Sequence, residues 1–331
     1  MSEGYYGRPV LKQPVWKPEI GWYFFAGGTA GAAATLSLAA RAARAPRLAR
    51  TATLVAGAGA AASPALLVAD LGRPERFLNM LRVFKPTSPM SVGSWIMTSF
   101  STAQMTAAAC ELAGVMPRLR TASQAAAGTL GPAMATYTAV LISDTAVPVW
   151  HEARRDLPGV FAAGSAASAG AAAVLVGPAE GSGPARRLQA VGALAEEVAL
   201  RRMTRRLGPL AEPYKTGASG RLATAGEAAT LGGAALTLLG GRGRLGRLGA
   251  AVTLAGSIAT RFAILRAGSA SAADPRYVIE SQRGHGEDTA TEAGAPGEHS
   301  GPHPAASRPA MRRPAAEAEG PRSRGGRLRA S

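Results

Sequence analysis

Residues 86–110 read PTSPMSVGSWIMTSFSTAQMTAAAC, a run of 25 residues without a charged side chain. A helix needs about 20 such residues to cross the hydrocarbon core of a bilayer, so this run is long enough to span a membrane. Four more uncharged runs of comparable length occur at residues 21–40, 51–69, 121–143 and 157–179. Because soluble domains of ordinary composition do not contain five such runs, we predict an all-α, polytopic membrane helix bundle.

The C-terminal half contains three weaker runs. Residues 222–241 and 248–265 each contain a single charged side chain. Residues 188–204 are interrupted by Glu196 and Glu197, and they form either another span or an amphipathic helix on the membrane surface. We therefore expect about eight transmembrane helices, with seven as the alternative.

Composition divides the chain into four segments. We expect a polar N-terminal segment at residues 1–18, the transmembrane bundle at 19–266, a juxtamembrane segment at 267–280 and a disordered tail at 281–331. The chain is basic, with 37 Lys and Arg against 21 Asp and Glu, but much of the excess lies in loops that flank the spans. That placement is typical of membrane proteins, so we expect contact with lipid and no nucleic acid partner.

Residue counts restrict the redox and metal centres that the chain can hold. Its single cysteine, Cys110, cannot form an internal disulfide or hold an iron–sulfur cluster. Of its four histidines, His151 is the one that precedes the tail. We therefore expect no haem held by two histidines within the membrane, no iron–sulfur cluster and no metal site in this chain.

Ionisable residues within or beside the spans are candidates for function because burying them in lipid is costly. Asp70 closes the second run and is the first candidate. The structural alternative is that Asp70 caps a helix at the interface and pairs with Arg73 or Arg76.

The fourth run is interrupted by Asp144 and continues to Trp150, and Tyr137, Asp144 and His151 follow one another here at intervals of seven residues. Seven residues are nearly two helical turns, so a continuous helix places the three side chains along one stripe. Pro148 is expected to kink this helix and free a carbonyl group. A phenol, a carboxylate and an imidazole in line would suit proton delivery to a redox carrier; alternatively, Tyr137 packs in the core and His151 lies at the interface.

The first span adds Glu19 and Tyr23, which are four residues apart and share one helix face. If eight helices cross the membrane, then Glu19, Asp70 and His151 lie toward the same membrane face, where we expect a pocket for a membrane-soluble molecule. In the last two spans, Glu227 and Arg261 are expected to pair, or Glu227 to hold a proton.

Three stretches carry a family resemblance: DLGRPERFLNMLRVFKPTSPMSVGSW at residues 70–95, WYFF at 22–25 and TAVPVW at 145–150. They resemble the NrfD/polysulfide reductase membrane-subunit family, and the resemblance extends over roughly residues 15–280. It implies a haem-free, eight-helix, multi-pass subunit of the cell membrane that binds menaquinone or ubiquinone.

The resemblance also implies partners and a site. Such a subunit exchanges electrons with a four-cluster, ferredoxin-like iron–sulfur subunit, which connects to a molybdopterin catalytic subunit acting on polysulfide, formate or nitrite-pathway substrates. The quinone pocket of the family lies among the first four helices. By matching position, Glu19 or Tyr23, Asp70 and Tyr137 are its expected residues here.

The residues and the resemblance lead to the same expected function, a quinone site close to a partner's cluster, with no catalytic centre of its own. Quinol oxidation releases protons, and Asp70 and Asp144 are the expected acceptors, provided that Asp144 is buried. Two alternatives remain. One is a transporter or an ion or proton channel with Asp144, Glu227 and Arg261 along its path, although the sequence shows no internal repeat. The other is a structural anchor for partner subunits.

Overall fold

The computed structural model describes residues 11, 14, 16–71, 73 and 75–279. The tail expected to be disordered, residues 281–331, lies outside the described residues, as does most of the N-terminal segment. The described part is all-helical, without strands. Its long helices are α1 (Pro18–Ala42), α2 (Pro46–Leu71), α4 (Pro89–Ala113), α5 (Pro117–Ser143), α7 (Leu157–Val176), α8 (Gly183–Leu207), α10 (Gly217–Gly240) and α11 (Arg244–Ala273).

Short helical pieces connect the long helices. They are α3 (Glu75–Met80), α6 (Pro148–Glu152), α9 (Glu212–Lys215) and two 3₁₀ turns, η2 (Ala153–Arg155) and η3 (Gly208–Ala211). Proline begins α1, α2, α4, α5 and α6, a position where its missing N–H costs no helical hydrogen bond. Gly114 ends α4 with φ of 68°, a left-handed conformation that glycine adopts without steric cost.

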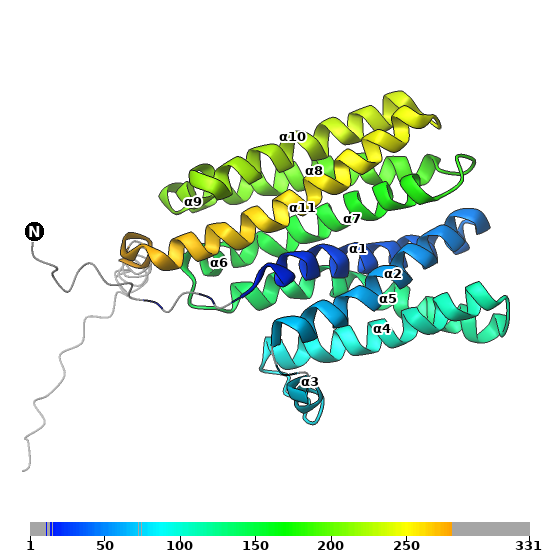
Figure 1. Ribbon diagram of the computed structural model, residues 1–331, viewed down its shortest axis with the longest axis horizontal. Helices are drawn as coiled ribbons and strands as arrows, with labels where there is room; N and C mark the ends of the chain where they lie inside the picture. The colour runs from blue at the N-terminus through cyan, green and yellow to red at the C-terminus, as the bar shows by residue number, and fades with distance from the viewer. Residues whose placement is uncertain (1–10, 12–13, 15, 72, 74, 280–331) are drawn as a thin grey trace, which may run out of the picture. The chain divides into compact units, whose positions relative to one another are not determined.

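The long helices form two closed rings of four. Helices α1, α2, α4 and α5 each contact two neighbours in the first ring, and α7, α8, α10 and α11 do the same in the second. Figure 1 shows the two groups beside each other, and α7 joins them through contacts with α1 and α5. The sequence shows no internal repeat, but the helix arrangement repeats.

Glycine lets the helices approach closely. At Gly31 of α1, an added Cβ would lie 2.5 Å from the carbonyl oxygen of Gly131 on α5 and 2.9 Å from the nitrogen of Ala135. Gly233 of α10 and Gly249 of α11 face each other's backbones in the same way. Small residues at helix crossings permit this packing where lipid supplies no hydrophobic drive for association.

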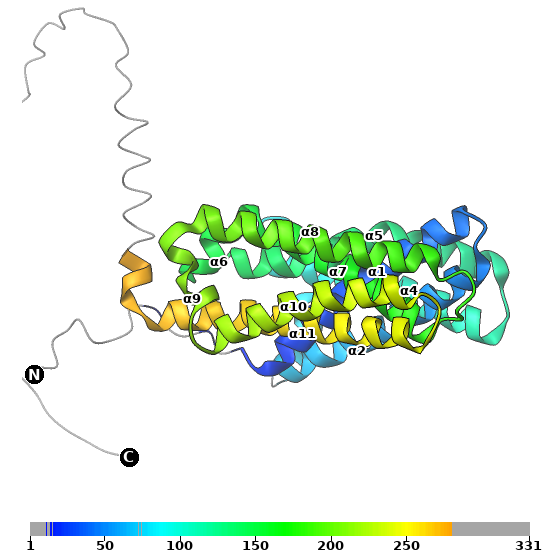
Figure 2. The same ribbon diagram turned by 90° about the horizontal axis from the view of Figure 1, so that it is seen from above.

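Five of the long helices are long and apolar enough to cross a membrane, namely α2, α5, α7, α10 and α11. Helices α1 and α4 are long but rich in Gly, Ser and Thr, and α8 carries several arginines as well as Glu196 and Glu197. Helix α8 nevertheless runs alongside α7 and α10 within the second ring, as Figures 1 and 2 show.

The predicted continuation of the fourth span through residue 150 is wrong. Helix α5 ends at Ser143, Asp144 is its C-terminal cap, and Pro148 begins the separate helix α6. The physical reason is that proline cannot donate the helical hydrogen bond and restricts the preceding residue, here Val147, to an extended conformation. At the C-terminal side, α11 continues beyond the expected boundary at residue 266, to Ala273.

The chain alternates direction along the bundle, so alternate connections lie at the same end. The start of α1, the end of α2, and helices α3, α6 and α9 all lie at one end, on the left in Figure 1. We call it the site end. Glu19, Asp70 and His151 therefore lie toward one end, as the sequence predicts.

Candidate functional site

A cavity of about 300 Å³ opens at the site end of the first ring. Its walls come from α1, α2, α4 and α5, with Met80 of α3 and the connections before α1 and after α5 completing them. The exposed part of its lining is mostly apolar. Four of the predicted site residues line it together: Tyr23, Asp70, Tyr137 and Asp144.

Two tyrosines form the inner part of the cavity. The Tyr23 hydroxyl lies 3.7 Å from the Sδ of Met97, and its ring packs edge-on against Tyr137, with centroids 6.4 Å apart. The buried Tyr137 hydroxyl has no hydrogen-bond partner among the described residues. Gly93 makes room for this ring, because a Cβ there would lie 2.7 Å from the Tyr137 Cδ2. A buried hydroxyl without a partner is costly, so Tyr137 is a donor available to a bound molecule.

Asp70 is held by the first helix. Its Oδ1 accepts a hydrogen bond of 3.1 Å from the backbone N–H of Lys17, the residue that precedes α1. Lys17 makes no side-chain cap of its own, so Asp70 caps α1 from the end of α2. The structural alternative from the sequence was thus right about capping, but the partner found among the described residues is a backbone group rather than Arg73.

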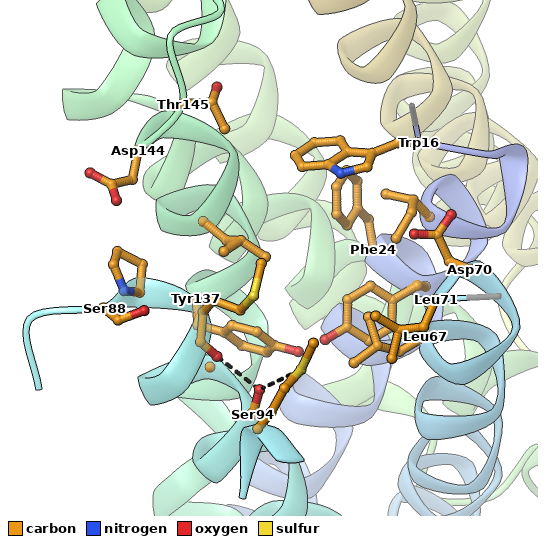
Figure 3. Close-up of a pocket in the computed structure, with 17 residues that line it drawn as sticks. Trp16, Phe24, Leu67, Asp70, Leu71, Ser88, Ser94, Tyr137, Asp144 and Thr145 are labelled. Atoms are coloured by element: carbon orange, nitrogen blue, oxygen red, sulfur yellow. Dashed lines mark hydrogen bonds between the residues drawn. The ribbon is translucent and has the colours of Figure 1, made fainter. Parts of the chain in front are cut away.

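Asp144 lies across the cavity from Asp70, on the turn after α5, as Figure 3 shows. Its side chain is exposed, so the burial that an internal proton relay requires is absent. Asp144 and Tyr137 line one cavity, but they and His151 do not form a stripe on one helix, because α5 ends before Asp144.

The other two predicted residues lie outside the cavity lining. His151 is on α6, where its Nδ1 lies 3.2 Å from the carbonyl oxygen of Ser143. That contact joins α6 to the end of α5 and supports the turn that carries Asp144. Glu19 lies in the first turn of α1 and is half-buried, and its buried Oε2 atom has no partner in residues 16–71 or the other described residues.

Sequence reasoning missed Trp16, which covers one side of the cavity (Figure 3). Its ring stacks on Trp150 with centroids 5.2 Å apart, and Trp150 donates a 2.9 Å hydrogen bond to the carbonyl oxygen of Ile264 on α11. Trp16 therefore ties the cavity to the second ring. No sequence signal indicates this stacking, because the partners are more than a hundred residues apart.

Ser88 and Ser94 of the cavity wall were also missed. Ser88 is the N-cap of α4, and Ser94 donates a hydrogen bond of 2.8 Å to the carbonyl oxygen of Met90 (Figure 3). Here a signal existed, because a serine followed by Pro89 is a typical helix start. That signal places the start of α4, but it does not show that the helix lines the cavity.

The predicted pair between Glu227 and Arg261 is wrong. Glu227 of α10 faces α8 and lies 3.2 Å from Arg201. Arg261 points instead into the second ring, where its Nη2 donates a 3.1 Å hydrogen bond to the carbonyl oxygen of Phe161 on α7. Two residues on neighbouring helices need not face each other. In the packed second ring, Glu227 contacts α8 and Arg261 contacts α7.

Across the described residues, no group of three or more His, Cys, Asp or Glu side chains could hold a metal ion. Cys110 is buried and free. The cavity therefore offers aromatic, hydroxyl and carboxylate groups, an arrangement suited to holding a planar organic molecule with polar oxygens.

The sequence itself identifies the family. Residues 10–180 match the protein family described as polysulphide reductase, NrfD, which is more than half of the 331 residues. The chain belongs to the NrfD family. With several helices able to cross a bilayer, this NrfD protein is a multi-pass membrane protein. Comparison with curated proteins finds no match. The NrfD match covers α1 to α7 and so includes the whole cavity, whereas α8, α10 and α11 lie beyond it.

Proposed function

We propose that this NrfD protein is a haem-free subunit that exchanges electrons between the quinone pool and an iron–sulfur subunit docked at its site end. That partner would connect to a molybdopterin catalytic subunit, and all eight long helices would cross the cell membrane. The observation that carries the proposal is the unpartnered hydroxyl of Tyr137, buried in a largely apolar cavity.

The cavity fits a quinone head group, either menaquinone or ubiquinone. Its volume of about 300 Å³ is at the lower end of the range for small-molecule sites, and its few polar groups converge from separate helices. The rings of Tyr23, Phe24 and Trp16 supply flat apolar walls, and Tyr137 supplies a donor for a carbonyl oxygen.

A bound quinone supplies reversible electron and proton transfer. Tyr137 would donate a hydrogen bond to one oxygen of the quinone and help to hold it in place. Asp70 accepts the N–H of Lys17 through Oδ1, and its Oδ2 would be the oxygen that takes up a proton. Asp144 is exposed at the other side of the cavity and exchanges protons with water. The two carboxylates thus provide an inner and an outer proton acceptor.

A surface for the partner lies beside the cavity. The segment that follows α2 exposes three large apolar side chains, Leu78, Val83 and Phe84. We call them the α3 patch. Exposed apolar side chains grouped on a loop favour contact with another protein. A partner's cluster docked there would lie near the quinone site, as electron transfer requires of a chain without its own redox centre.

Quinone binding provides the test. The purified full-length protein in lipid nanodiscs is titrated with a short-tailed menaquinone analogue, and tryptophan fluorescence is followed because Trp16 lines the cavity. We expect saturable quenching. Replacing Tyr137 with Phe removes one hydrogen bond and should raise the Kd about tenfold.

Tyr214→Phe is the matched control, because Tyr214 is also buried with an unpartnered hydroxyl but lies outside this cavity. Its Kd should equal that of the unaltered protein. Absence of saturable quenching would favour the structural anchor or the transporter. An equal rise of the Kd in both variants would indicate that the quinone binds outside this cavity.

A further inference from the structure

The second ring contains a separate cavity of about 250 Å³ that is lined in part by charged side chains. It lies between α8, α10 and α11, near the site end, where α9 contributes Tyr214 and Lys215. Glu197, Arg201 and Glu227 also line it. Arg201 forms ion pairs with both glutamates, so these charged side chains compensate one another.

A less compensated pair is adjacent in sequence to two residues of this lining: Glu196 precedes Glu197 on α8, and Arg261 follows Thr260 on α11. Glu196 of α8 and Arg261 of α11 are each only 2% exposed. Arg261 has one guanidinium nitrogen bonded to the Phe161 carbonyl, and the guanidinium lies over the Phe161 ring, 4.1 Å from its centroid. Within the part of the chain that the structure describes, its Nη1 has no hydrogen-bond partner, and neither has Glu196 Oε1. Glu196 Oε1 is thus a buried acceptor, and Arg261 Nη1 a buried donor, whose hydrogen-bonding capacity is not used.

Gly164 of α7 creates the space for these groups. A Cβ on Gly164 would collide with Glu196 Oε1 and lie 2.8 Å from Arg261 Nη2. Both charged groups therefore converge on one backbone position of α7. The unpartnered Glu196 oxygen is directed into this shared space rather than toward solvent.

The charges around Glu196 can be counted element by element. Arg261 faces it from α11, Glu197 lies beside it on α8, and Glu227 lies beyond Glu197 on α10. Helix α7 contributes Gly164 and the Phe161 ring, neither of which is charged. A positive neighbour favours the charged form of a carboxylate and burial favours its neutral form, and Glu196 has both. Opposing influences of this kind suit a group that both takes up and releases a proton.

We propose that Glu196 is a proton-exchanging carboxylate of the second ring, loaded from the cavity lined by Glu197 and Glu227. A hydronium ion in that cavity transfers its proton to Glu196 Oε1, which forms a neutral carboxylic acid and leaves water, and the reverse step returns the proton. Arg261 keeps its charge throughout. The site is separate from the quinone cavity, so it does not depend on the function proposed above.

Dicyclohexylcarbodiimide tests the proposal because it reacts with protonated carboxyl groups in apolar surroundings. The carboxylic acid adds across a carbodiimide C=N bond, and the product rearranges to a stable N-acylurea that retains all atoms of both reactants. The full-length protein in nanodiscs is treated over a range of pH and digested, and labelled peptides are identified by mass spectrometry. We expect the label on Glu196, falling about tenfold per pH unit above the pH at which Glu196 ionises.

Variants distinguish a Glu196 carboxyl that takes up and releases a proton from one that stays ionised beside Arg261. Glu196→Gln should abolish that label, whereas Glu180→Gln, a change at a carboxylate that is 77% exposed in the connection between α7 and α8, should preserve it. Arg261→Gln removes the positive neighbour, so labelling should persist to higher pH. Circular dichroism verifies that each variant is folded, and labelling of the unaltered protein decides the question if Glu196→Gln does not fold. Glu196 unlabelled at every pH, or a pH profile unaffected by Arg261→Gln, would overturn the proposal and leave a permanently ionised pair.

Discussion

At the scale of single residues, Asp70 combines two roles that different substitutions can separate. Its Oδ1 caps α1 through the Lys17 N–H, and its carboxylate lines the quinone cavity that we propose. An amide retains an acceptor for the cap but cannot hold a proton in the same way. An alanine loses both.

We therefore expect Asp70→Asn to slow quinol turnover in the assembled complex with its thermal unfolding unchanged. Asp70→Ala should also lower the free energy of unfolding by about 1 kcal/mol, the usual value of a cap. Glu180→Gln, at a carboxylate that is 77% exposed and outside the cavity, should alter neither measurement, because its surface ion pair with Arg47 contributes little stability. Unchanged turnover in Asp70→Asn would favour the structural anchor.

Tyr277 provides a residue whose protonation affects stability. It lies after α11, and its hydroxyl donates a 3.0 Å hydrogen bond to Glu212 at the start of α9. Burial, together with this bond to Glu212, raises the pKa of Tyr277 from 10.0 to about 12. The fold favours the neutral phenol, so its contribution to stability is complete below pH 10 and is lost as the pH rises through about 12.

The unfolding midpoint of the unaltered protein should consequently exceed that of Tyr277→Phe at pH 9, and the difference should disappear as the pH rises from 10 to about 12. Thermal unfolding followed by circular dichroism at several pH values measures it. A difference that stays constant across this range would show that the Tyr277 hydroxyl does not titrate in the folded protein as its surroundings indicate.

At the scale of helices, the crossing of α1 and α5 depends on glycine. A Cβ at Gly31 would meet the backbone of α5, which cannot move as a flexible side chain can. Gly31→Ala should therefore separate the helices and lower the free energy of unfolding by about 1–3 kcal/mol. Chemical denaturation of the purified protein measures this loss.

Gly232→Ala is the matched control, because Gly232 is an exposed glycine of α10 with nothing within 4 Å of an added Cβ. Alanine there should stabilise the helix by about 0.5–1 kcal/mol. If Gly31→Ala proved as harmless as this control, the close approach of α1 and α5 would not be needed for the fold.

Helix ends account for the main error of the sequence interpretation. The uncharged run at residues 121–143 predicts the body of α5 well, since length and lack of charge are properties of the run itself. The stripe of Tyr137, Asp144 and His151 assumed that the helix continues, but Pro148 begins a new helix. A proline in sequence indicates a kink or a break, and only the packing of α6 shows which occurs.

At the scale of the whole molecule, the α3 patch and the cavity lie at the same end, so docking and quinone binding should be separable. Phe84→Ser should reduce copurification of the iron–sulfur subunit and leave binding of the quinone analogue unchanged, because Phe84 does not line the cavity. Leu239→Ser changes a side chain that is 85% exposed near the end of α10 and should leave copurification unchanged. Equal loss in both variants would argue against the α3 patch as the docking surface.

The sequence by itself determined the membrane-helix class, the family and the candidates Tyr23, Asp70, Tyr137 and Asp144, which line one cavity. These follow from local properties: run length, charge and short motifs. Only the tertiary structure decided the two rings, the stacking of Trp16 on Trp150 and the facing of Glu196 toward Arg261. The physical reason is that all three features depend on which faces of distant helices pack together. Small residues at the helix crossings determine this packing, and they act between segments that are far apart in the chain.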